Sequence, residues 1–299
     1  MFRWRRSSFD AIGISSLILA TGGICRARKG ISLKYQPGSH LRIARPEFME
    51  RTELLDTYSR IGSVTASAGC EFLGVADLAI AERQIREQGG EVVAGFPKAV
   101  SIGITLPHAI VDQLPNRADP AVAANYRSHA GEVINERLNS VASQVAGVLQ
   151  GQGYRALPIP ASATTDEEGL CGVFPHKMAA HLAGLGWIGK SCLLVTPEAG
   201  PRVRWISVLT DAPLPATGGL TEERCKSCTD CVDICPAQAF TGRPFLADEP
   251  RSARYDAAKC SEYYGELAKD AGSGVCGLCV YICPIGSKQA VPHQGIAAL

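Results

Sequence analysis

The sequence predicts a chain in two parts, a mixed α/β or α+β domain followed by a small cysteine-rich domain. Two observations support this fold class. Between residues 49 and 215, segments with helical periodicity alternate with short apolar runs rich in β-branched residues, a pattern typical of sheets covered by helices. Eight of the 12 cysteines then lie within residues 225–283, after a turn-rich stretch at 211–219. We therefore predict domains at 49–215 and 216–299, preceded by a basic extension at 1–48.

The elements of the first domain follow from local patterns. Asp119-Pro120 combines an N-cap residue with proline at the first helical position, so a long helix is expected from there to the glycines at 151 and 153. Apolar periodicity predicts two further helices, and runs of apolar residues bounded by turn signals predict strands. The helices are expected at 49–70 and 176–183, and the strands at 72–78, 99–106, 156–161, 192–196 and 202–210.

The cysteine-rich segment has the spacing of iron-sulfur cluster ligands. Residues 225–236 follow C-x2-C-x2-C-x3-C-P, residues 276–284 repeat the second half of this pattern, and Cys260 lies between the two runs. In ferredoxins with two clusters, the fourth cysteine of such a run binds the other cluster. We therefore predict two 4Fe-4S clusters that exchange a ligand. One is assigned to Cys225, Cys228, Cys231 and Cys283, and the other to Cys235, Cys260, Cys276 and Cys279.

Cysteines in such pairs have two other common roles. A single C-x-x-C pair also occurs in zinc sites and in redox dithiols. Eight cysteines, two runs that end in Cys-Pro and no interleaved histidine favour iron-sulfur clusters. The remaining cysteines lack the spacing of a disulfide framework, so we expect them to be buried apolar residues in a reducing, cytoplasmic compartment. They are Cys25, Cys70, Cys171 and Cys192.

Charge is unevenly distributed along the chain. Residues 1–48 hold nine of the 30 Lys and Arg but only two of the 29 Asp and Glu, which leaves a body with a net charge of −6. An acidic body gives no general footprint for nucleic acid. The extension resembles an export signal, because three arginines precede an apolar run at 11–24 that is too short to span a bilayer. We favour the alternative that Met49 is the start and that the preceding residues are read-through sequence or a tail.

Residues 184–191 read GLGWIGKS and match the pattern of a phosphate-binding P-loop. A P-loop joins a strand to a following helix, so that the amides at the helix N-terminus hold the phosphate. Here the predicted order is reversed, with a helix before the segment and a strand after it. The context therefore argues against a nucleotide site.

Several segments together resemble the epoxyqueuosine reductases, a family allied to the corrinoid reductive dehalogenases. They are AGLGWIGKS (183–191), GPRVRWISVLTDAPL (200–214), LGVADL (73–78), FPKAVSIGI (96–104) and the cysteines with an isolated Cys260 between two runs. The resemblance implies a nitroreductase-like α/β domain followed by a ferredoxin-like domain with two 4Fe-4S clusters. It also implies a cobalamin held between the two domains and reduced by the nearer cluster.

The resemblance also suggests site residues. Gly186, Trp187, Gly189, Lys190 and Ser191 are predicted to contact the cobalamin, although a tight turn would need the same glycines. Epoxyqueuosine reductases carry a catalytic Asp in a D-S-A-P-like segment, whereas residues 171–177 of this chain contain no carboxylate. We therefore predict His176 and Lys177 as proton donors, with His181 as a further candidate. For His176 a capping or surface role is the alternative.

The sequence is compatible with three function classes. The first is an iron-sulfur reductase that resembles epoxyqueuosine reductase, takes electrons from a ferredoxin or flavodoxin, and acts on a small or nucleoside-like substrate. Transfer RNA is a further candidate substrate that the charge does not support, and no membrane partner is expected. The second is a non-catalytic dicluster electron carrier, and the third a nucleotide-driven reductase. A carrier needs only the cluster domain, so the large preceding domain favours the first class.

Overall fold

The computed structural model describes residues 51–166, 168–271 and 274–286. All of them lie in one compact unit, so the predicted boundary between residues 215 and 216 stays a prediction. The predicted extension at 1–48 lies outside the described residues. Among the residues described, no helix is long and apolar enough to cross a membrane.

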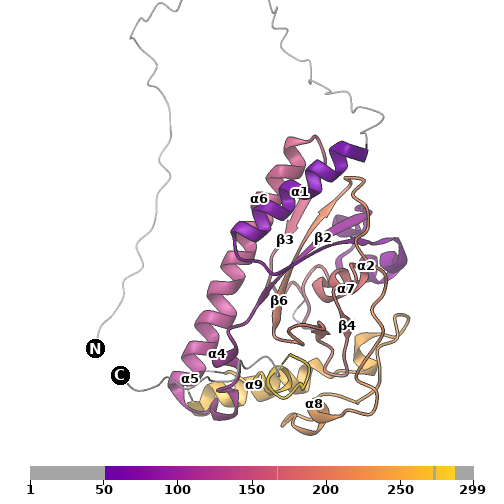
Figure 1. Cartoon of the computed structure of the whole chain (residues 1–299). Coiled ribbons are helices and arrows are strands. Elements are labelled where there is room, and N and C mark those ends of the chain that lie inside the picture. Colours follow the sequence, from indigo (N-terminus) through magenta and orange to yellow (C-terminus); the bar gives the residue numbers. More distant parts are fainter. Residues whose placement is uncertain (1–50, 167, 272–273, 287–299) are drawn as a thin grey trace, which may run out of the picture. The chain divides into compact units, whose positions relative to one another are not determined.

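A four-stranded sheet lies at the centre of the first part of the chain (Figure 1). Its strand order is β1-β2-β6-β3. All three neighbouring pairs are antiparallel. The structure therefore decides between the two predicted classes in favour of α+β, because an α/β sheet is mainly parallel. The strands are β1 (Phe72–Asp77), β2 (Lys98–Thr105), β3 (Ala156–Ile159) and β6 (Val203–Thr210).

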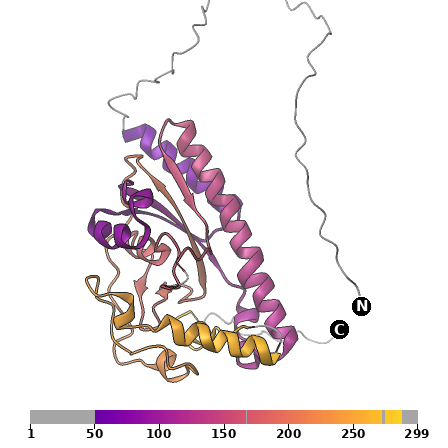
Figure 2. The same ribbon diagram turned by 180° about the vertical axis from the view of Figure 1, so that it is seen from behind.

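Helices cover both faces of this sheet. On one face Ile102 and Ile206 pack in a core with Leu138 of α6 (Ile134–Gly151), and α1 (Arg51–Ser67) lies beside α6 (Figure 2). On the other face Leu209 packs with Ala179 of α7 (His176–Leu182). Successive residues of a strand point to opposite faces, so a sheet buried on both sides needs the nearly continuous apolar runs seen in the sequence.

The predicted long helix is confirmed, but it contains a turn that the sequence did not predict. The Asp119 carboxylate accepts a hydrogen bond from the Ala121 amide at 2.8 Å and caps α5 (Pro120–Asn125). A π-helix (Tyr126–Val133) then continues into α6. Such wider turns occur frequently at functional sites. In this chain the turn carries Tyr126, a buried side chain close to Cys276 and Cys279.

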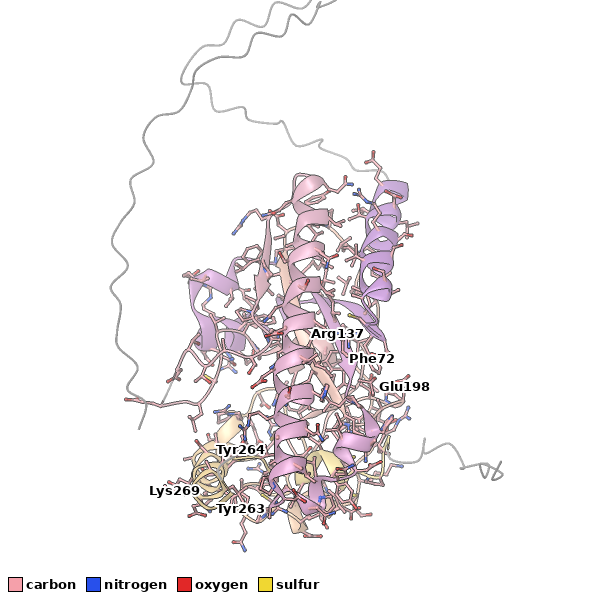
Figure 3. All side chains as sticks on the ribbon, turned by 90° about the vertical axis from the view of Figure 1, so that its left-hand side faces the viewer. Phe72, Arg137, Glu198, Tyr263, Tyr264 and Lys269 are labelled. Carbon is pink, nitrogen blue, oxygen red and sulfur yellow. The ribbon has the colours of Figure 1, made fainter. Side chains whose placement is uncertain are left out.

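The cysteine-rich part is built from short helices and one longer helix, α9 (Ala257–Ala271). Figure 3 shows Tyr263 and Tyr264 on α9. Arg117 Nη2 donates a hydrogen bond to the Tyr263 hydroxyl at 2.7 Å, which ties α9 to the first part of the chain. The short helices here are α8 (Asp230–Asp233), η4 (Arg251–Ala253) and α10 (Leu278–Tyr281).

The predicted elements between residues 49 and 215 are all found, with ends that differ by a few residues. The expected strand at 192–196 shortens to β5 (Leu194–Val195), which pairs with β4 (Trp187–Ile188) in a separate ribbon. Several short helices were not predicted. They are η1 (Ala79–Ala81), α2 (Glu82–Gly89), α3 (Glu91–Ala94), α4 (His108–Val111) and η2 (Leu114–Asn116).

We predict that Leu138→Ala destabilises the fold by about 2–5 kcal/mol, because it removes a fully buried side chain between α6 and the sheet and leaves a cavity. Anaerobic urea unfolding of the cluster-loaded protein measures the change. Leu55→Ala, at a side chain that is 55% exposed on α1, is the matched control and should change stability by less than about 0.5 kcal/mol. Equal effects of the two substitutions would contradict the core described above.

Candidate iron-sulfur centre

The structure brings together the four cysteines predicted for one cluster, the first cysteine group: Cys225, Cys228, Cys231 and Cys283. Burial and the neighbouring Cys225, Cys283 and Cys228 raise the pKa of Cys231 to about 12. Burial and two members of the group likewise help to raise the pKa of Cys283 to about 11. Thiols packed so closely repel one another as thiolates, and cationic iron relieves this repulsion when it binds them.

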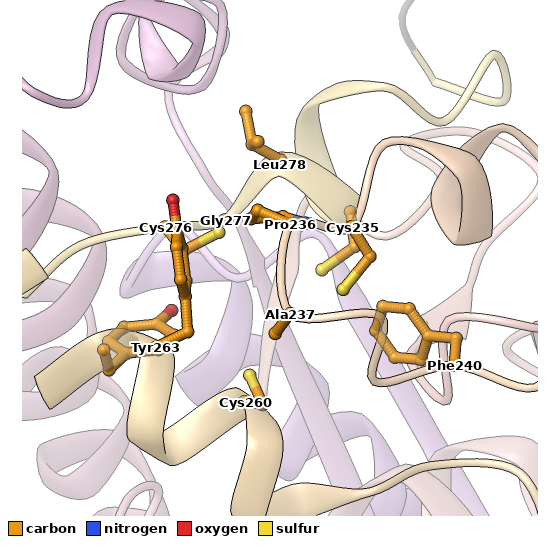
Figure 4. Close-up of a pocket in the computed structure, with 11 residues that line it drawn as sticks. Cys235, Pro236, Ala237, Phe240, Cys260, Tyr263, Cys276, Gly277 and Leu278 are labelled. Atoms are coloured by element: carbon orange, nitrogen blue, oxygen red, sulfur yellow. The ribbon is translucent and has the colours of Figure 1, made fainter. Parts of the chain in front are cut away.

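The other four cysteines, Cys235, Cys260, Cys276 and Cys279, form the second cysteine group. All four line one pocket (Figure 4). Burial and the three other members of the group raise the pKa of Cys279 to about 12. Four thiols around a cavity suit a multi-iron cluster, whereas zinc ligands all meet one ion at about 2.3 Å. No three His, Cys, Asp or Glu side chains within the described ranges are placed to hold a single metal ion.

Both groups therefore have the exchanged membership that the sequence predicted. Cys283 lies with the first run although it follows the second, and Cys235 lies with the second run although it ends the first. Cys231 also contributes to the raised pKa of Cys279, so the two groups are neighbours. The ligand roles themselves stay predictions.

Hydrogen bonds to sulfur surround both groups. The amide of Ala239 donates to Cys235 Sγ at 3.5 Å, and the Leu278 amide donates to the Cys276 sulfur. The phenol of Tyr255 is hydrogen-bonded to Cys260. Such hydrogen bonds, together with burial, set the reduction potential of an iron-sulfur cluster.

The GLGWIGKS segment at 184–191 contacts the loop that carries the first cysteine group. Trp187 Nε1 donates to Cys225 Sγ at 3.5 Å, and the Lys190 amide hydrogen-bonds to the same sulfur. Lys190 Nζ donates to the carbonyl oxygens of Lys226 and Cys228 at 2.6 and 3.1 Å. The segment therefore fixes the loop that presents three of the predicted ligands, a role that the sequence did not reveal.

The residues predicted to contact a cobalamin are buried within the chain. Trp187 is 1% exposed, and Lys190 and Ser191 are buried with it. A side chain at Gly186 would overlap the Val195 carbonyl, and one at Gly189 would meet Val195 Cγ2 at 2.9 Å. Close packing of the β4–β5 ribbon thus accounts for both glycines. Because these five residues offer no open surface, they do not fit a corrin contact in this structure, and their cofactor role stays a prediction.

The same segment lacks the context of a P-loop. Helix α7 precedes it, β4 lies within it, and β5 follows it. The amine that would bind phosphate is engaged by two carbonyl groups. The structure therefore agrees with the sequence argument against a nucleotide site.

His176 is held at both ring nitrogens. Nε2 lies 3.0 Å from the Pro160 carbonyl oxygen, and Nδ1 lies 3.0 Å from Ser207 Oγ. A carbonyl only accepts, so Nε2 carries the proton and Nδ1 of the neutral ring accepts from the serine hydroxyl. Burial lowers the pKa of His176, which favours this neutral form. This geometry suits an anchor between β6 and the segment after β3, and the proton-donor role stays a prediction.

Lys177 reaches a turn beside the cluster domain. Its Nζ donates to the Cys192 carbonyl oxygen at 2.6 Å, and burial lowers the pKa of Lys177. Cys192 itself has a left-handed backbone with a φ of 54°, a strained conformation for a residue with a side chain. The proton-donor role of Lys177 stays a prediction. His181 instead binds the Gly186 carbonyl oxygen through Nδ1.

Arg202 and Arg204, which lie two residues apart around the start of β6, make contacts within the chain. Arg202 is 2% exposed, forms an ion pair with Asp112 at 2.7 Å, and lies 3.4 Å from the Tyr281 carbonyl oxygen. Arg204 donates to the Ala130 carbonyl oxygen at 3.0 Å. Arg202 therefore links the sheet to the segment between Cys279 and Cys283.

Comparison with known proteins defines the class of the cysteine-rich part. Residues 224–286 match the family model of the 4Fe-4S double cluster binding domain. The match contains all eight predicted ligands, and this part of the chain is accordingly a dicluster iron-sulfur domain.

The predicted resemblance to epoxyqueuosine reductases is confirmed over most of the chain. An epoxyqueuosine reductase from Pseudomonas aeruginosa is 29% identical over 232 residues, which cover 74% of this chain and 60% of that protein. The tetrachloroethene reductive dehalogenase of Sulfurospirillum multivorans is 35% identical over 127 residues, which cover 38% of this chain and 24% of that one. The chain thus spans 60% of the length of the first relative and 24% of the length of the second.

Solved structures share the fold. A catabolic reductive dehalogenase in complex with 3-bromo-4-hydroxybenzoic acid superposes with a TM-score of 0.57 at 21% identity, covering 76% of this chain and 31% of that one. An epoxyqueuosine reductase with a modified tRNA stem loop gives 0.53 at 18% identity, covering 79% and 66%. The chain therefore has the fold found in these two groups of reductases.

We predict that Cys260→Ser removes one cluster and leaves the other, because Cys260 belongs to the second cysteine group and not to the first. Anaerobic reconstitution should give about eight iron atoms per wild-type chain and about four per variant chain. Cys70→Ser, at a cysteine outside both groups, is the control and should keep the wild-type iron content. About four iron atoms in the fully reconstituted wild type would contradict the two-cluster assignment.

We also predict that Lys190→Gln makes the first cluster about tenfold more labile, since it removes charged hydrogen bonds to the carbonyls of Lys226 and Cys228. The rate of iron loss to a chelator, followed by the cluster absorption, measures this. Lys259→Gln, at an exposed residue, serves as the control.

Calorimetry with Mg-ATP tests the same residue in another way. The intact wild-type protein should give no saturable heat, because the Lys190 amine is already engaged. Tight binding of ATP that Lys190→Gln abolishes would overturn this assignment and restore the nucleotide-driven hypothesis.

Proposed function

We propose that the protein is an iron-sulfur reductase that passes electrons from a low-potential donor through its two clusters to a cobalamin and a bound substrate. The observation that carries this proposal is the pair of neighbouring cysteine groups packed against a larger α+β part of the same compact unit. A carrier would need only the dicluster part. The sheet and its helices, which form most of the described chain, support a domain that binds a cofactor or substrate.

The electron path follows from the neighbouring groups. Cys231 of the first group and Cys279 of the second are close enough to affect one another, and cluster potentials extend to about −700 mV. A ferredoxin or flavodoxin has the chemistry to supply such electrons. Both groups contact the α+β part, but it is the second group that lies near Tyr126 and near the predicted proton donor Lys177, through Cys279. We therefore assign the first group to electron entry and the second to delivery.

Cobalamin is proposed from relatives rather than from contacts in this chain. A solved reductive dehalogenase described as acting by B12-dependent dehalogenation has a TM-score of 0.54 at 22% identity, covering 75% of this chain and 31% of that one. When bound, cobalamin would supply a strongly reducing metal centre. Because the predicted contact residues are buried, other residues of this chain would have to hold the cobalamin. We also propose that the α+β domain is nitroreductase-like.

The proposed substrate is a small or nucleoside-like molecule in a reducing, cytoplasmic environment. A related enzyme was solved with an epoxyqueuosine-modified tRNA stem loop, so epoxyqueuosine is the first compound to test. The net charge of −6 outside residues 1–48 gives no support for a large tRNA interface. Lys177, with its pKa lowered by burial, is the residue of the predicted pair better suited to transfer a proton.

We predict that the anaerobically reconstituted protein binds cob(II)alamin saturably at micromolar concentration and that its clusters reduce the bound corrin. The corrin absorption spectrum follows both events. Cys260→Ser should retain binding but lose reduction by a donor that acts through the clusters.

Two outcomes would each contradict a part of this proposal. If no corrin binds to the fully loaded protein, the reductase hypothesis fails and the electron-carrier hypothesis replaces it. If corrin is reduced equally well in Cys260→Ser, the assigned electron path through the second group is wrong.

A further inference from the structure

Three cationic side chains from distant segments converge on the turn that contains Cys192. Lys177 comes from α7, Arg251 begins η4, and Arg254 directly follows η4. The charges of all three act on the Cys192 thiol, and those of Arg251 and Arg254 act on Lys177. Like charges repel strongly in a partly buried site. A negative group nearby would reduce the repulsion among these three charges.

Arg254 is the member of this cluster with two buried donor nitrogens that have no hydrogen-bond partner among the described residues. Its side chain is 5% exposed, and its Nε and Nη1 are buried without a hydrogen-bond partner among the described residues. The guanidinium lies 4.6 Å from the centre of the Phe245 ring, which provides a flat support but no acceptor. A buried charged donor without a hydrogen-bond partner is destabilising. A bound acceptor would remove this destabilisation.

The protein does not provide the counter-charge from its described carboxylates. No Asp or Glu oxygen of the described chain lies within 4.0 Å of the charged nitrogens of these three residues. Asp166, which affects Cys171 together with Arg251, already accepts from the amides of Glu168 and Gly169. Arg251 is held by the carbonyls of Gly169 and Leu170. These contacts fix the position of the Arg251 side chain but do not neutralise the positive charge of the three residues.

The three cations lie beside the electron-delivering cysteine group. Lys177 is close enough to Cys279 to be affected by it, and Arg251 lies 5.8 Å from the ring centre of Tyr255, the residue bonded to Cys260. A ligand held here would therefore sit next to the second cluster.

We infer that Lys177, Arg251 and Arg254 form a binding site for an oxyanion, namely a carboxylate or phosphate group carried by the molecule that receives the electrons. Arginine binds both groups in a bidentate manner, and lysine adds a point charge. The site rests on the proposed function for its purpose, since it would orient an anionic substrate or cofactor beside the second cluster. A phosphodiester on the nucleotide arm of a cobalamin and an acid group on the substrate share this chemistry.

The test uses the anaerobically reconstituted protein with both clusters loaded. Calorimetric titrations with inorganic phosphate and with benzoate measure binding to the wild type, Arg254→Gln, Arg254→Lys and Lys177→Gln. We expect saturable binding of at least one probe to the wild type, at least tenfold weaker binding to Arg254→Gln and Lys177→Gln, and partial recovery in Arg254→Lys. Arg83→Gln, at an exposed arginine on α2, is the control and should bind as the wild type does.

Two results would overturn the site. One is the absence of saturable binding of either probe to the loaded wild type, which would mean that the cations only balance the charge of the cluster. The other is unchanged binding in Arg254→Gln and Lys177→Gln when iron content and thermal unfolding match the wild type. If Arg254→Gln fails to take up iron, Lys177→Gln and Arg254→Lys decide the question by the same criteria.

Two corrins separate the two sources of the anion. Cobinamide lacks the nucleotide phosphodiester that cobalamin carries. If that phosphodiester is the ligand, Arg254→Gln weakens cobalamin binding and leaves cobinamide binding unchanged. If a substrate acid is the ligand, both corrins bind the variant normally while phosphate or benzoate binding falls. Anion binding without any corrin binding would remove the cobalamin proposal and leave the site standing.

Discussion

The structure depends on the exchange of one cysteine between two distant runs. Cys283 joins the first group and Cys235 joins the second, so neither group is complete until residues 225–235 and 276–283 meet. Closing a loop of this length costs on the order of 3 kcal/mol in chain entropy. Bonds to iron can offset that cost, which couples the folding of this part of the chain to cluster binding. Helix α8 carries Cys231 of the first group and helix α10 carries Cys279 of the second. The two helices pack together, as the exchange of cysteines requires.

The link between the clusters and the sheet is the segment at 184–191. It follows α7, which packs on one face of the sheet, and it returns through the β4–β5 ribbon. Trp187 and Lys190 then bind the loop of the first group, while the neighbouring turn at Cys192 reaches the cations near the second. A single segment thus fixes both groups relative to the α+β domain. Its tight glycine turns leave no room for side chains at Gly186 or Gly189.

Local patterns in the sequence predicted local features well. The strands, the Asp119 cap and the membership of both cysteine groups follow from periodicity, capping chemistry and ligand spacing. The antiparallel strand order could not be predicted in this way, because the alternation of residues along one strand does not show which distant strand pairs with it. The π-helix at Tyr126 also escaped prediction, since its residues have ordinary helical propensity. The role of Lys190 was hidden because a motif gives residue types but not the direction in which the amine points.

Arg254 shows why the proposed anion site could not be predicted from the sequence. Arg251 and Arg254 follow a proline and a turn and resemble surface residues, and Lys177 lies some 70 residues earlier at the start of a short helix. Only the fold brings them to one corner, where burial makes each charge costly. A protein retains such a cost when a negative partner offsets it. Electrons that arrive on the adjacent cluster add negative charge, and an anionic ligand adds more. The cations therefore favour both events at one position, as the proposed reductase function requires.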